Sequence, residues 1–340
     1  MVHFDLSHEL VLSDLTDVAS LSCVNFFSML HVAKIMSESP NIYLNDPDPL
    51  SVLLKRMSLR AEVYVNGDFC GSWAVDTSGS RRIPFHLIGK GQAWLHFENE
   101  TIVLNEKDLV VFPRDHQHII SSSPIKPAKK LVNQPAKGAG ETTNMVCGFF
   151  QFNHTLVNPL LDALPEFLHI PATSSSCNSR IMQLIDMMIV ELQQRRTGCY
   201  TIVDQLANLV FIEILREQVE AGKLNNGMLV ALFDNRIGKA LNAIHQQPEY
   251  AWNLASLASK ASMSRSNFAD KFTKLVGLSP MKYLLKWRLI EARKLLICSD
   301  ISIAEIAQLS GYETEAAFRK AFKQHQGEAP GAVRSAMVGH

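Results

Sequence analysis

The final hundred residues contain one pattern twice, fifty positions apart. Two phenylalanines, a glycine and a proline keep the same spacing in each copy: Phe268, Phe272, Gly277 and Pro280, then Phe318, Phe322, Gly327 and Pro330. An apolar pair precedes each set, Leu257-Ala258 and Ile306-Ala307. These pairs are only forty-nine positions apart, so the second copy has one more residue in its turn. A repeat this sparse and this regular indicates two copies of one supersecondary unit.

Each copy has the pattern of a helix, a short turn and a second helix. Ser264 and Thr314 are good N-caps for the second helix, and the phenylalanines at i and i+4 define its buried side. Short polar and basic side chains on a capped helix after a tight turn are typical of a helix that enters the major groove of DNA. The candidate DNA-binding residues are Arg265, Ser266, Asn267, Asp270, Thr273, Lys274, Glu315, Ala316, Arg319, Lys320, Lys323 and Gln324.

The charge of the chain is divided between its two parts. Thirty-three basic residues balance thirty-three acidic ones overall, but residues 235–340 hold 15 basic and 8 acidic, a net of +7. The first 234 residues hold the other 18 and 25, a net of −7. A basic module suggests a polyanionic partner. One copy alone would fit an ordinary helical hairpin with a solvated face, whereas two copies with this charge favour double-stranded DNA.

The upstream region has a different pattern. Short β-rich runs separated by turn residues fill residues 59–152, which indicates an antiparallel sandwich or barrel. Helical periodicity follows, with apolar faces that could form a core of their own or the interface of a homodimer; the candidates for this interface are Leu184, Met188, Leu192, Leu206 and Leu209. The expected divisions are an unassigned extension at 1–47, a β domain at 48–170, a linker and helical region at 171–234 and the repeat domain at 235–340.

The C-terminal domain resembles the double helix-turn-helix (HTH) domain of the AraC/XylS-family transcription regulators. The matching stretches include Trp252-Asn-Leu-Ala-Ser-Leu-Ala, Met263-Ser-Arg-Ser-Asn-Phe, Gly277-Leu-Ser-Pro, Ala292-Arg-Lys-Leu-Leu, Ile303-Ala-Glu-Ile-Ala and Gly311-Tyr-Glu-Thr-Glu-Ala-Ala-Phe. The resemblance implies two recognition helices in successive major grooves, joined by a long helix at 281–298. It also implies a transcription activator that works with RNA polymerase.

Residues 48–170 resemble the cupin-type sensor domain of one branch of that family. The resemblance rests on Phe85-His-Leu-Ile, Gly91-Gln-Ala-Trp-Leu, Asp108-Leu-Val-Val-Phe-Pro, His118, Val146-Cys-Gly, and Leu164-Pro with His169. It implies an α+β multidomain chain: a cupin-like antiparallel β-barrel, central helices and an all-α double HTH. A small-molecule effector would then bind in the barrel, and the residues expected at its mouth are Phe85, His86, Trp94 and His118.

The family's metal and catalytic patterns are incomplete. His86 lacks its His-x-His partner, Pro113-Arg-Asp replaces Pro-x-Gly before His118, and Lys107 stands in place of the turn glycine. No metal or cofactor is therefore expected. A metal-dependent cupin enzyme is the alternative from another class, but no nucleotide-binding loop or Gly-x-Ser-x-Gly motif is present, and an enzyme is not expected.

The cysteines leave a second alternative open within the regulator class. Six are scattered without a C-x-x-C pair, which fits a reducing cytoplasm. Cys70, next to a predicted turn, and Cys147, in an apolar strand, are the candidates for a redox switch. The stretch Val18–Met36 is too interrupted by polar residues to span a membrane, and the N-terminus lacks the pattern of a secretory signal.

Overall fold

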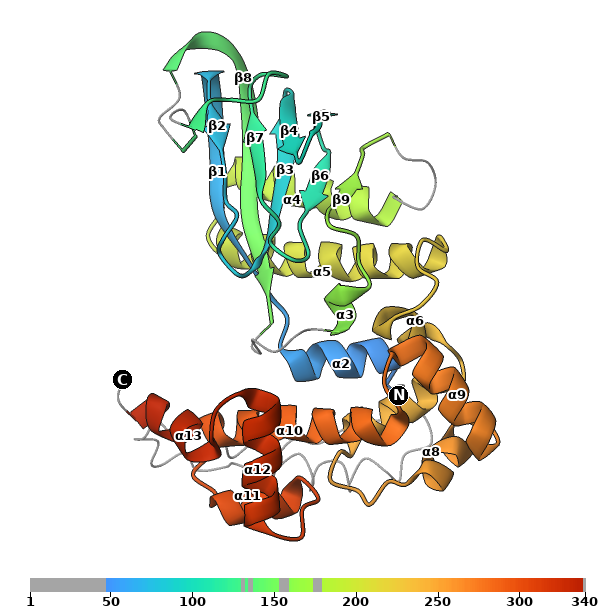
Figure 1. Cartoon of the computed structure of the whole chain (residues 1–340). Coiled ribbons are helices and arrows are strands. Elements are labelled where there is room, and N and C mark those ends of the chain that lie inside the picture. The colour runs from blue at the N-terminus through green and yellow to red at the C-terminus, as the bar shows by residue number, and fades with distance from the viewer. Residues whose placement is uncertain (1–46, 130–131, 134–136, 153–158, 174–178, 339–340) are drawn as a thin grey trace, which may run out of the picture. The chain divides into compact units, whose positions relative to one another are not determined.

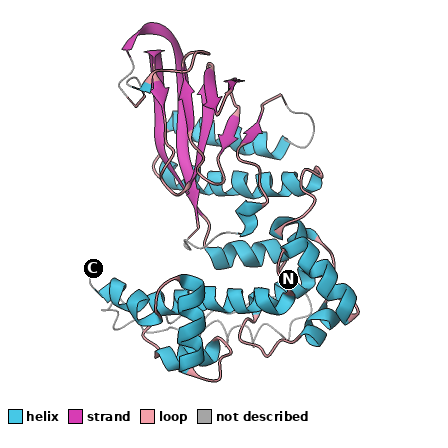
Figure 2. Ribbon diagram, viewed as in Figure 1, coloured by secondary structure: helices cyan, strands magenta, loops and turns pink. Residues whose placement is uncertain are grey.

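The structure is a computed structural model that describes residues 47–129, 132–133, 137–152, 159–173 and 179–338 (Figure 1). The extension expected at 1–47 therefore lies outside the described residues, except for Pro47, as does the stretch Val18–Met36. The described part begins with a short helix, continues with β strands that one further short helix interrupts, and is helical from residue 179 to its end (Figure 2).

The strands form two antiparallel sheets. The five-stranded sheet has the order β1 (Arg60–Ser72), β8 (Lys137–Gln151), β3 (Ile83–Lys90), β6 (Leu109–Val111) and β9 (Leu168–Ile170). The four-stranded sheet has the order β2 (Ala74–Val75), β7 (His118–Ser121), β4 (Ala93–Phe97) and β5 (Glu100–Leu104). The antiparallel cupin-like fold is confirmed, with its strands paired as two sheets of a sandwich.

Strand alternation gives the five-stranded sheet two apolar faces. Ile88 and Cys147 of this sheet share a core with Leu95 and Ile120 of the other, so this core lies between the sheets. Alternate residues, such as Phe150, face the opposite way. Phe150 stacks on Phe211 with ring centroids 4.5 Å apart. The sheet is therefore covered by α5 (Cys199–Glu220), which packs against α4 (Ser179–Gln194).

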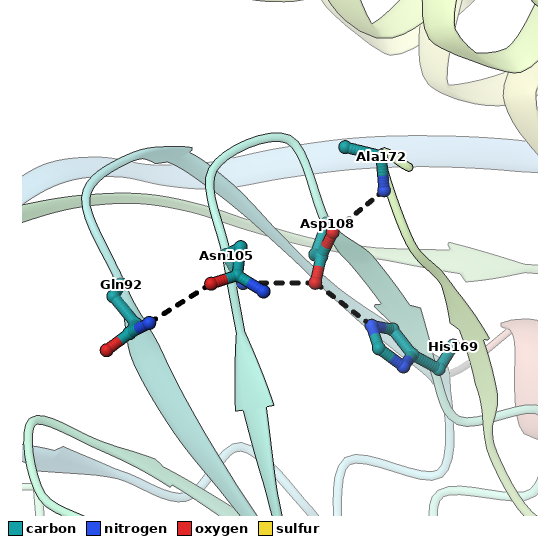
Figure 3. Close-up of polar contacts among 5 residues, drawn as sticks. All are labelled: Gln92, Asn105, Asp108, His169 and Ala172. Atoms are coloured by element: carbon teal, nitrogen blue, oxygen red, sulfur yellow. Dashed lines mark hydrogen bonds and ion pairs between the residues drawn. The ribbon is translucent and has the colours of Figure 1, made fainter. Parts of the chain in front are cut away.

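A buried carboxylate holds the turn before β6 (Figure 3). Asp108 accepts hydrogen bonds from the backbone N–H groups of Asn105 and Ala172 and lies 3.1 Å from Nε2 of His169 on β9. Burial opposes its charge, but these hydrogen bonds hold the pKa of Asp108 below its usual value. Lys107, which replaces the family's turn glycine, has a φ of +68° and pairs with Asp186 of α4 at 2.8 Å. The turn geometry is thus kept without the glycine.

The helices outside the sandwich follow in chain order. Before and within the β region lie α2 (Pro49–Met57) and α3 (Pro159–Asp162), and after α5 lie α6 (Met228–Phe233) and α7 (Ile237–Gln246). The repeat region forms α8 (Leu254–Lys260), α9 (Arg265–Val276), α10 (Pro280–Cys298), α11 (Ile303–Leu309), α12 (Glu315–Gln326) and α13 (Pro330–Val338). The predicted pair of HTH units is therefore α8–α9 and α11–α12, with α10 between them.

The two HTH units do not share a core. Phe268 and Phe272 of α9 belong to an apolar core that continues through α6 and α7 to α5 and the outer face of the five-stranded sheet. Phe318 and Phe322 of α12 lie in a separate core with the second half of α10 and with Val333 of α13. One core thus crosses residue 235, and the division of the chain at that point stays a prediction.

Candidate functional site

The first HTH unit has a cap at each end of α9. The side chain of Ser264 accepts a hydrogen bond from the N–H of Asn267, and Gly277 ends the helix with a φ of +80°. In the preceding turn Ser262 has a φ of +51°. Phe268 and Phe272 are fully buried, so the buried side of α9 is the one that the sequence indicates.

The second unit repeats this arrangement. Thr314 accepts a hydrogen bond from the N–H of Ala317 at 3.2 Å, and Gly327 ends α12 with a φ of +82°. Gly311 provides the left-handed residue of the turn, with a φ of +75°. The extra residue of this copy therefore lies in the turn before α12, where the spacing of the repeat indicates it.

The twelve candidate DNA-binding residues lie on the outer sides of α9 and α12. Eleven are exposed, and Glu315 is half-buried. Glu315 holds the guanidinium of Arg319 at 2.6 Å, and the hydroxyl of Thr273 donates to the carbonyl of Ala269. These two contacts orient Arg319 and occupy the hydroxyl proton of Thr273. Most of the remaining candidates present amide, hydroxyl, guanidinium or ammonium groups that can contact bases or phosphates.

Two further contacts of α9 were not predicted from the sequence. Lys271 pairs with Asp234 at 2.6 Å, and the carbonyl of Leu275 accepts from the N–H of Gly227. Asp234 also accepts from two backbone N–H groups at the start of α7, and although burial opposes its charge, these bonds and Lys271 lower its pKa. These partners are 37 and 48 positions away in sequence, so no local signal could have identified them.

Within the sandwich, two of the four expected effector residues meet. The Nε2 atoms of His86 and His118 lie 3.0 Å apart, and the hydroxyl of Thr77 lies within 3.2 Å of both. Nδ1 of His118 lies 2.7 Å from the carbonyl of His116 and must donate to it. Nε2 of His118 is then an acceptor, and His86 donates to it through its own Nε2. Nδ1 of His86, 3.1 Å from the Cys147 sulfur, accepts the thiol proton.

Burial keeps this histidine–cysteine cluster neutral. It lowers the pKa of His86 and His118 and raises the pKa of Cys147 to about 12. In the part of the chain that the structure describes, no group of three or more His, Cys, Asp and Glu side chains is arranged to hold a metal ion. Two imidazoles and a hydroxyl do not make the usual three-ligand zinc or iron site, so these residues do not fit a cupin metal centre.

Phe85 and Trp94 do not join this cluster. Phe85 faces the helices and stacks on Phe150, since it alternates with His86 along β3. Trp94 alternates with Leu95, which lies in the inter-sheet core, so Trp94 faces the outside of the four-stranded sheet. The expectation that all four residues line one mouth is not met by this geometry. Only one face of each strand can point inward.

A cavity of about 790 Å³, lined largely by polar residues, has His118 in its lining. Lys126 and Lys129 line one part of it, and His116 and Gln117 another. Its remaining lining residues are Asp76, His96, Phe97, Glu98, His118, Ile119, Pro127 and Val132. The cavity was not predicted from the sequence because most of its residues lie in loops that carry no periodic signal.

Cys70 and Cys147 are far apart on the sheet. Cys70 is half-buried, and its sulfur lies 3.1 Å from the hydroxyl of Thr142. Thr142 and Cys147 are five positions apart along β8, which corresponds to roughly 16 Å in a strand. A disulfide needs Cα atoms within about 7 Å of each other. The two sulfurs therefore cannot join without rearrangement of β1 or β8.

Comparison with known proteins matches both halves of the chain. A family model described as "Cupin" matches residues 48–220, and one described as "Helix-turn-helix domain" matches residues 257–336. An uncharacterised HTH-type transcriptional regulator of Haemophilus influenzae is 33% identical over 302 residues, which cover 85% of this chain and 99% of that protein. The chain belongs to the AraC-like transcriptional regulators.

This regulator has further relatives of similar length. A putative AraC-like transcription regulator of Streptomyces lividans is 29% identical over 298 residues, which cover 84% of this chain and 98% of that one. Among solved structures, ToxT of Vibrio cholerae with an unsaturated fatty acid bound is 14% identical, with 88% of this chain and 99% of that chain covered and a TM-score of 0.37. The resemblance of the two domains to a cupin and to a double HTH domain is confirmed by the family matches.

The helices of the expected dimer interface pack largely within the regulator itself. Met188, Leu192 and Leu206 are buried, Leu184 is partly buried, and Leu209 is 48% exposed. The exposed apolar residues of α4 and α5 are Met187, Val190, Tyr200, Ile202 and Leu209. Three of the five predicted interface residues are therefore used by the monomer's own core.

In the described residues, no helix combines the length and the apolar character needed to cross a lipid bilayer.

Proposed function

We propose that this regulator recognises specific DNA sequences through α9 and α12, under the control of a small molecule that binds in the sandwich. The observation that carries the proposal is the pair of capped helices whose phenylalanines are buried while their polar and basic residues are exposed. Helices presented in this way read base edges in the major groove. The twelve exposed or half-exposed residues of α9 and α12 are the proposed contacts.

The basic excess supports phosphate contacts. A net charge of +7 over residues 235–340 favours the release of counterions when DNA binds, so affinity should fall steeply as salt increases. The test uses the full chain, because one core crosses residue 235 and a fragment starting there would expose apolar surface. Genome-wide mapping of the bound DNA supplies the target duplexes. Binding to them that is independent of salt and sequence would refute the proposal.

The effector is proposed to bind in the polar cavity that reaches His118. The lysines and histidines there can bind a polar group of a small molecule. His118 also belongs to the neutral cluster with His86 and Cys147, so a ligand in the cavity can act on the interior of the sandwich through it. His118→Ala is expected to abolish the response to effector in a reporter assay. DNA binding should remain.

The redox alternative has less support. At a pKa of about 12, Cys147 is a thiol at neutral pH, and oxidants react with thiolates. Cys70 is the more accessible of the two sulfurs. A response to oxidant that Cys70→Ser abolishes, together with a normal response of His118→Ala, would favour the redox switch over the small molecule.

The remaining parts of the proposal concern partners and setting. The regulator is proposed to act in the cytoplasm, to activate RNA polymerase at its target promoters and to have no catalytic activity. It is also proposed to form a homodimer, because two linked DNA-binding modules gain avidity. The exposed apolar residues of α4 and α5 support a dimer interface formed by these two helices. A lower level of target transcripts in a deletion strain would support activation, and a higher level would indicate repression.

A further inference from the structure

Arg288 lies near the middle of α10, the helix between the two HTH units (Figure 1). Its guanidinium makes two hydrogen bonds toward the first unit. Nε donates to the carbonyl of Pro248 at 2.7 Å, and Nη2 donates to the carbonyl of Tyr250 at 2.8 Å. A planar guanidinium that donates to two acceptors fixes direction as well as distance. Arg288 therefore anchors the segment that leads into α8.

The segment that leads into α8, residues 247–253, is itself fixed by further contacts. The indole N–H of Trp252 donates to the carbonyl of Gln247 at 2.8 Å, and its ring lies against Tyr250 with centroids 4.5 Å apart. Asn253 then caps α8, which begins at Leu254. α8 packs on α9 through the apolar core that contains Leu257 and Phe268. The position of Arg288 is thus connected by direct contacts to the first recognition helix.

The same guanidinium also lies against the turn of the second unit. A Cβ added to Gly311 would come within 2.5 Å of Nη1 and 2.8 Å of Cζ of Arg288. Glycine therefore has two reasons to stand at 311: its φ of +75° and this close approach. The next residue, Tyr312, packs on Phe318 of α12 with ring centroids 5.6 Å apart. Arg288 therefore contacts both units at the segments that position their recognition helices.

We infer that Arg288 is a positioning residue that fixes α9 relative to α12 and so sets the spacing between the two DNA segments that this regulator accepts. The inference rests on the proposed recognition of DNA by both helices. One added base pair moves the second segment by about 3.4 Å and turns it by roughly 35° around the DNA axis. If α9 and α12 are fixed relative to each other, they cannot both stay in their DNA segments after this displacement. If their relative position can change, they can.

The test measures how strongly binding depends on spacing. Duplexes are selected from a random pool by the full wild-type chain, and footprinting locates the two protected segments. Derivatives then carry one, two or three base pairs inserted between these segments. Dissociation constants are measured by fluorescence anisotropy for the wild type, Arg288→Ala, Arg288→Lys and Gly311→Ala. The readout is the ratio of affinities for the parent and the inserted duplexes.

For the wild type, one inserted base pair should lower affinity by about tenfold, which corresponds to about 1.4 kcal/mol. For Arg288→Ala the ratio should fall to about twofold, and Arg288→Lys should lie between, because an ammonium lacks the planar fork. Gly311→Ala should also lower the ratio, since its Cβ displaces the guanidinium from the other side. Loss of stability alone would reduce the amount of active protein equally for both duplexes and leave the ratio unchanged.

The matched control is Arg293→Ala. Arg293 lies on the same helix but pairs with Glu328, beside α13, at 2.6 Å, and its loss should leave the ratio as in the wild type. Wild-type ratios in Arg288→Lys and Gly311→Ala would overturn the inference even if Arg288→Ala fails to fold. A wild-type chain that protects a single segment would overturn the two-helix recognition first, and the role of Arg288 with it.

Discussion

The N–H of Gly227, at the start of α6, donates to the carbonyl of Leu275 in the last turn of α9 at 2.9 Å. A Cβ added to Gly227 would lie 2.5 Å from the Cβ of Ala163, which follows α3. Gly227 therefore contacts two segments: the one between α3 and β9, through Ala163, and the first recognition helix, through Leu275. With the Lys271–Asp234 pair, this contact attaches α9 to the helices that follow the sandwich.

Gly227→Ala should destabilise the protein by about 2–3 kcal/mol, because its φ of +102° is unfavourable for alanine and the new methyl group meets Ala163. Urea unfolding measures the change. Gly222→Ala is the control, since Gly222 also has a positive φ but has no atom within 4 Å of its added Cβ. Ala163→Gly should restore part of the stability lost in Gly227→Ala. Equal losses in the two glycine variants would contradict the predicted contact.

Exposed and buried residues of the recognition helices should respond differently. Asn267→Ala and Lys320→Ala should weaken DNA binding while the melting temperature stays nearly unchanged, because both side chains are exposed. Phe268→Ala and Phe318→Ala should each cost about 3–5 kcal/mol of stability, because both rings are fully buried. Anisotropy and thermal unfolding measure the two effects. Phenylalanine variants of wild-type stability would show that the assigned helix phase is wrong.

The buried imidazole of His245 should make the protein sensitive to acid. Burial first, and then the nearby charge of Arg56, lower the pKa of His245 to about 3, and its Nε2 lies 2.6 Å from the hydroxyl of Tyr283. In the unfolded chain its pKa is about 6.5. The unfolded state therefore binds more protons below pH 6.5, and stability falls as pH decreases from there toward 3.

From pH 6.5 to 5.5 this effect amounts to about 1 kcal/mol, because the unfolded-state imidazole is already half protonated at pH 6.5. It is measured by urea unfolding of the wild type and of His245→Gln at both pH values. The glutamine carbonyl can still accept from Tyr283 but does not titrate in this range. The other buried histidines contribute equally to both proteins, so the difference between them isolates His245. The same pH dependence in both proteins would contradict the assignment.

A charge on the exposed surface of α5 should disrupt the proposed dimer. Leu209 is 48% exposed, whereas Leu206, one turn earlier, is 6% exposed and packs in the core. Leu209→Arg should give a folded monomer in sedimentation, with weaker binding to DNA that contains two sites. Leu206→Arg, the control, should unfold the protein instead. A folded Leu209→Arg variant that remains dimeric would place the interface elsewhere.

The HTH units could be predicted in detail because their determinants are local. Caps such as Ser264 and Thr314, turn glycines such as Gly311, and phenylalanines at i and i+4 each act within a few residues. Their spacing in the sequence therefore gives the helix boundaries and the buried side without knowledge of the rest of the chain. The exposed outer side of both helices follows from the same phase.

The interior of the sandwich was harder to predict. His86 and His118 belong to strands of different sheets, and their meeting depends on strand pairing that no local pattern specifies. Phe85 and Trp94 were assigned to the same mouth, but adjacent residues of a strand face opposite sides. A rule of alternation applied to His86 would have excluded Phe85. For Trp94, the decisive fact is that the neighbouring Leu95 points to the inter-sheet core.

The separate core beneath α11 and α12 has a consequence for hydrogen exchange. Among the residues that the structure describes, Phe318 and Phe322 belong to a core formed by the segment from α10 to α13, so this unit can open locally while the sandwich stays folded. Phe268 and Phe272 belong to the core that reaches α5 and the sheet. Backbone amides of α12 should therefore exchange with solvent deuterium at a lower free energy of opening than those of α9, although the two helices have the same length and each has a hydroxyl N-cap and a glycine C-cap.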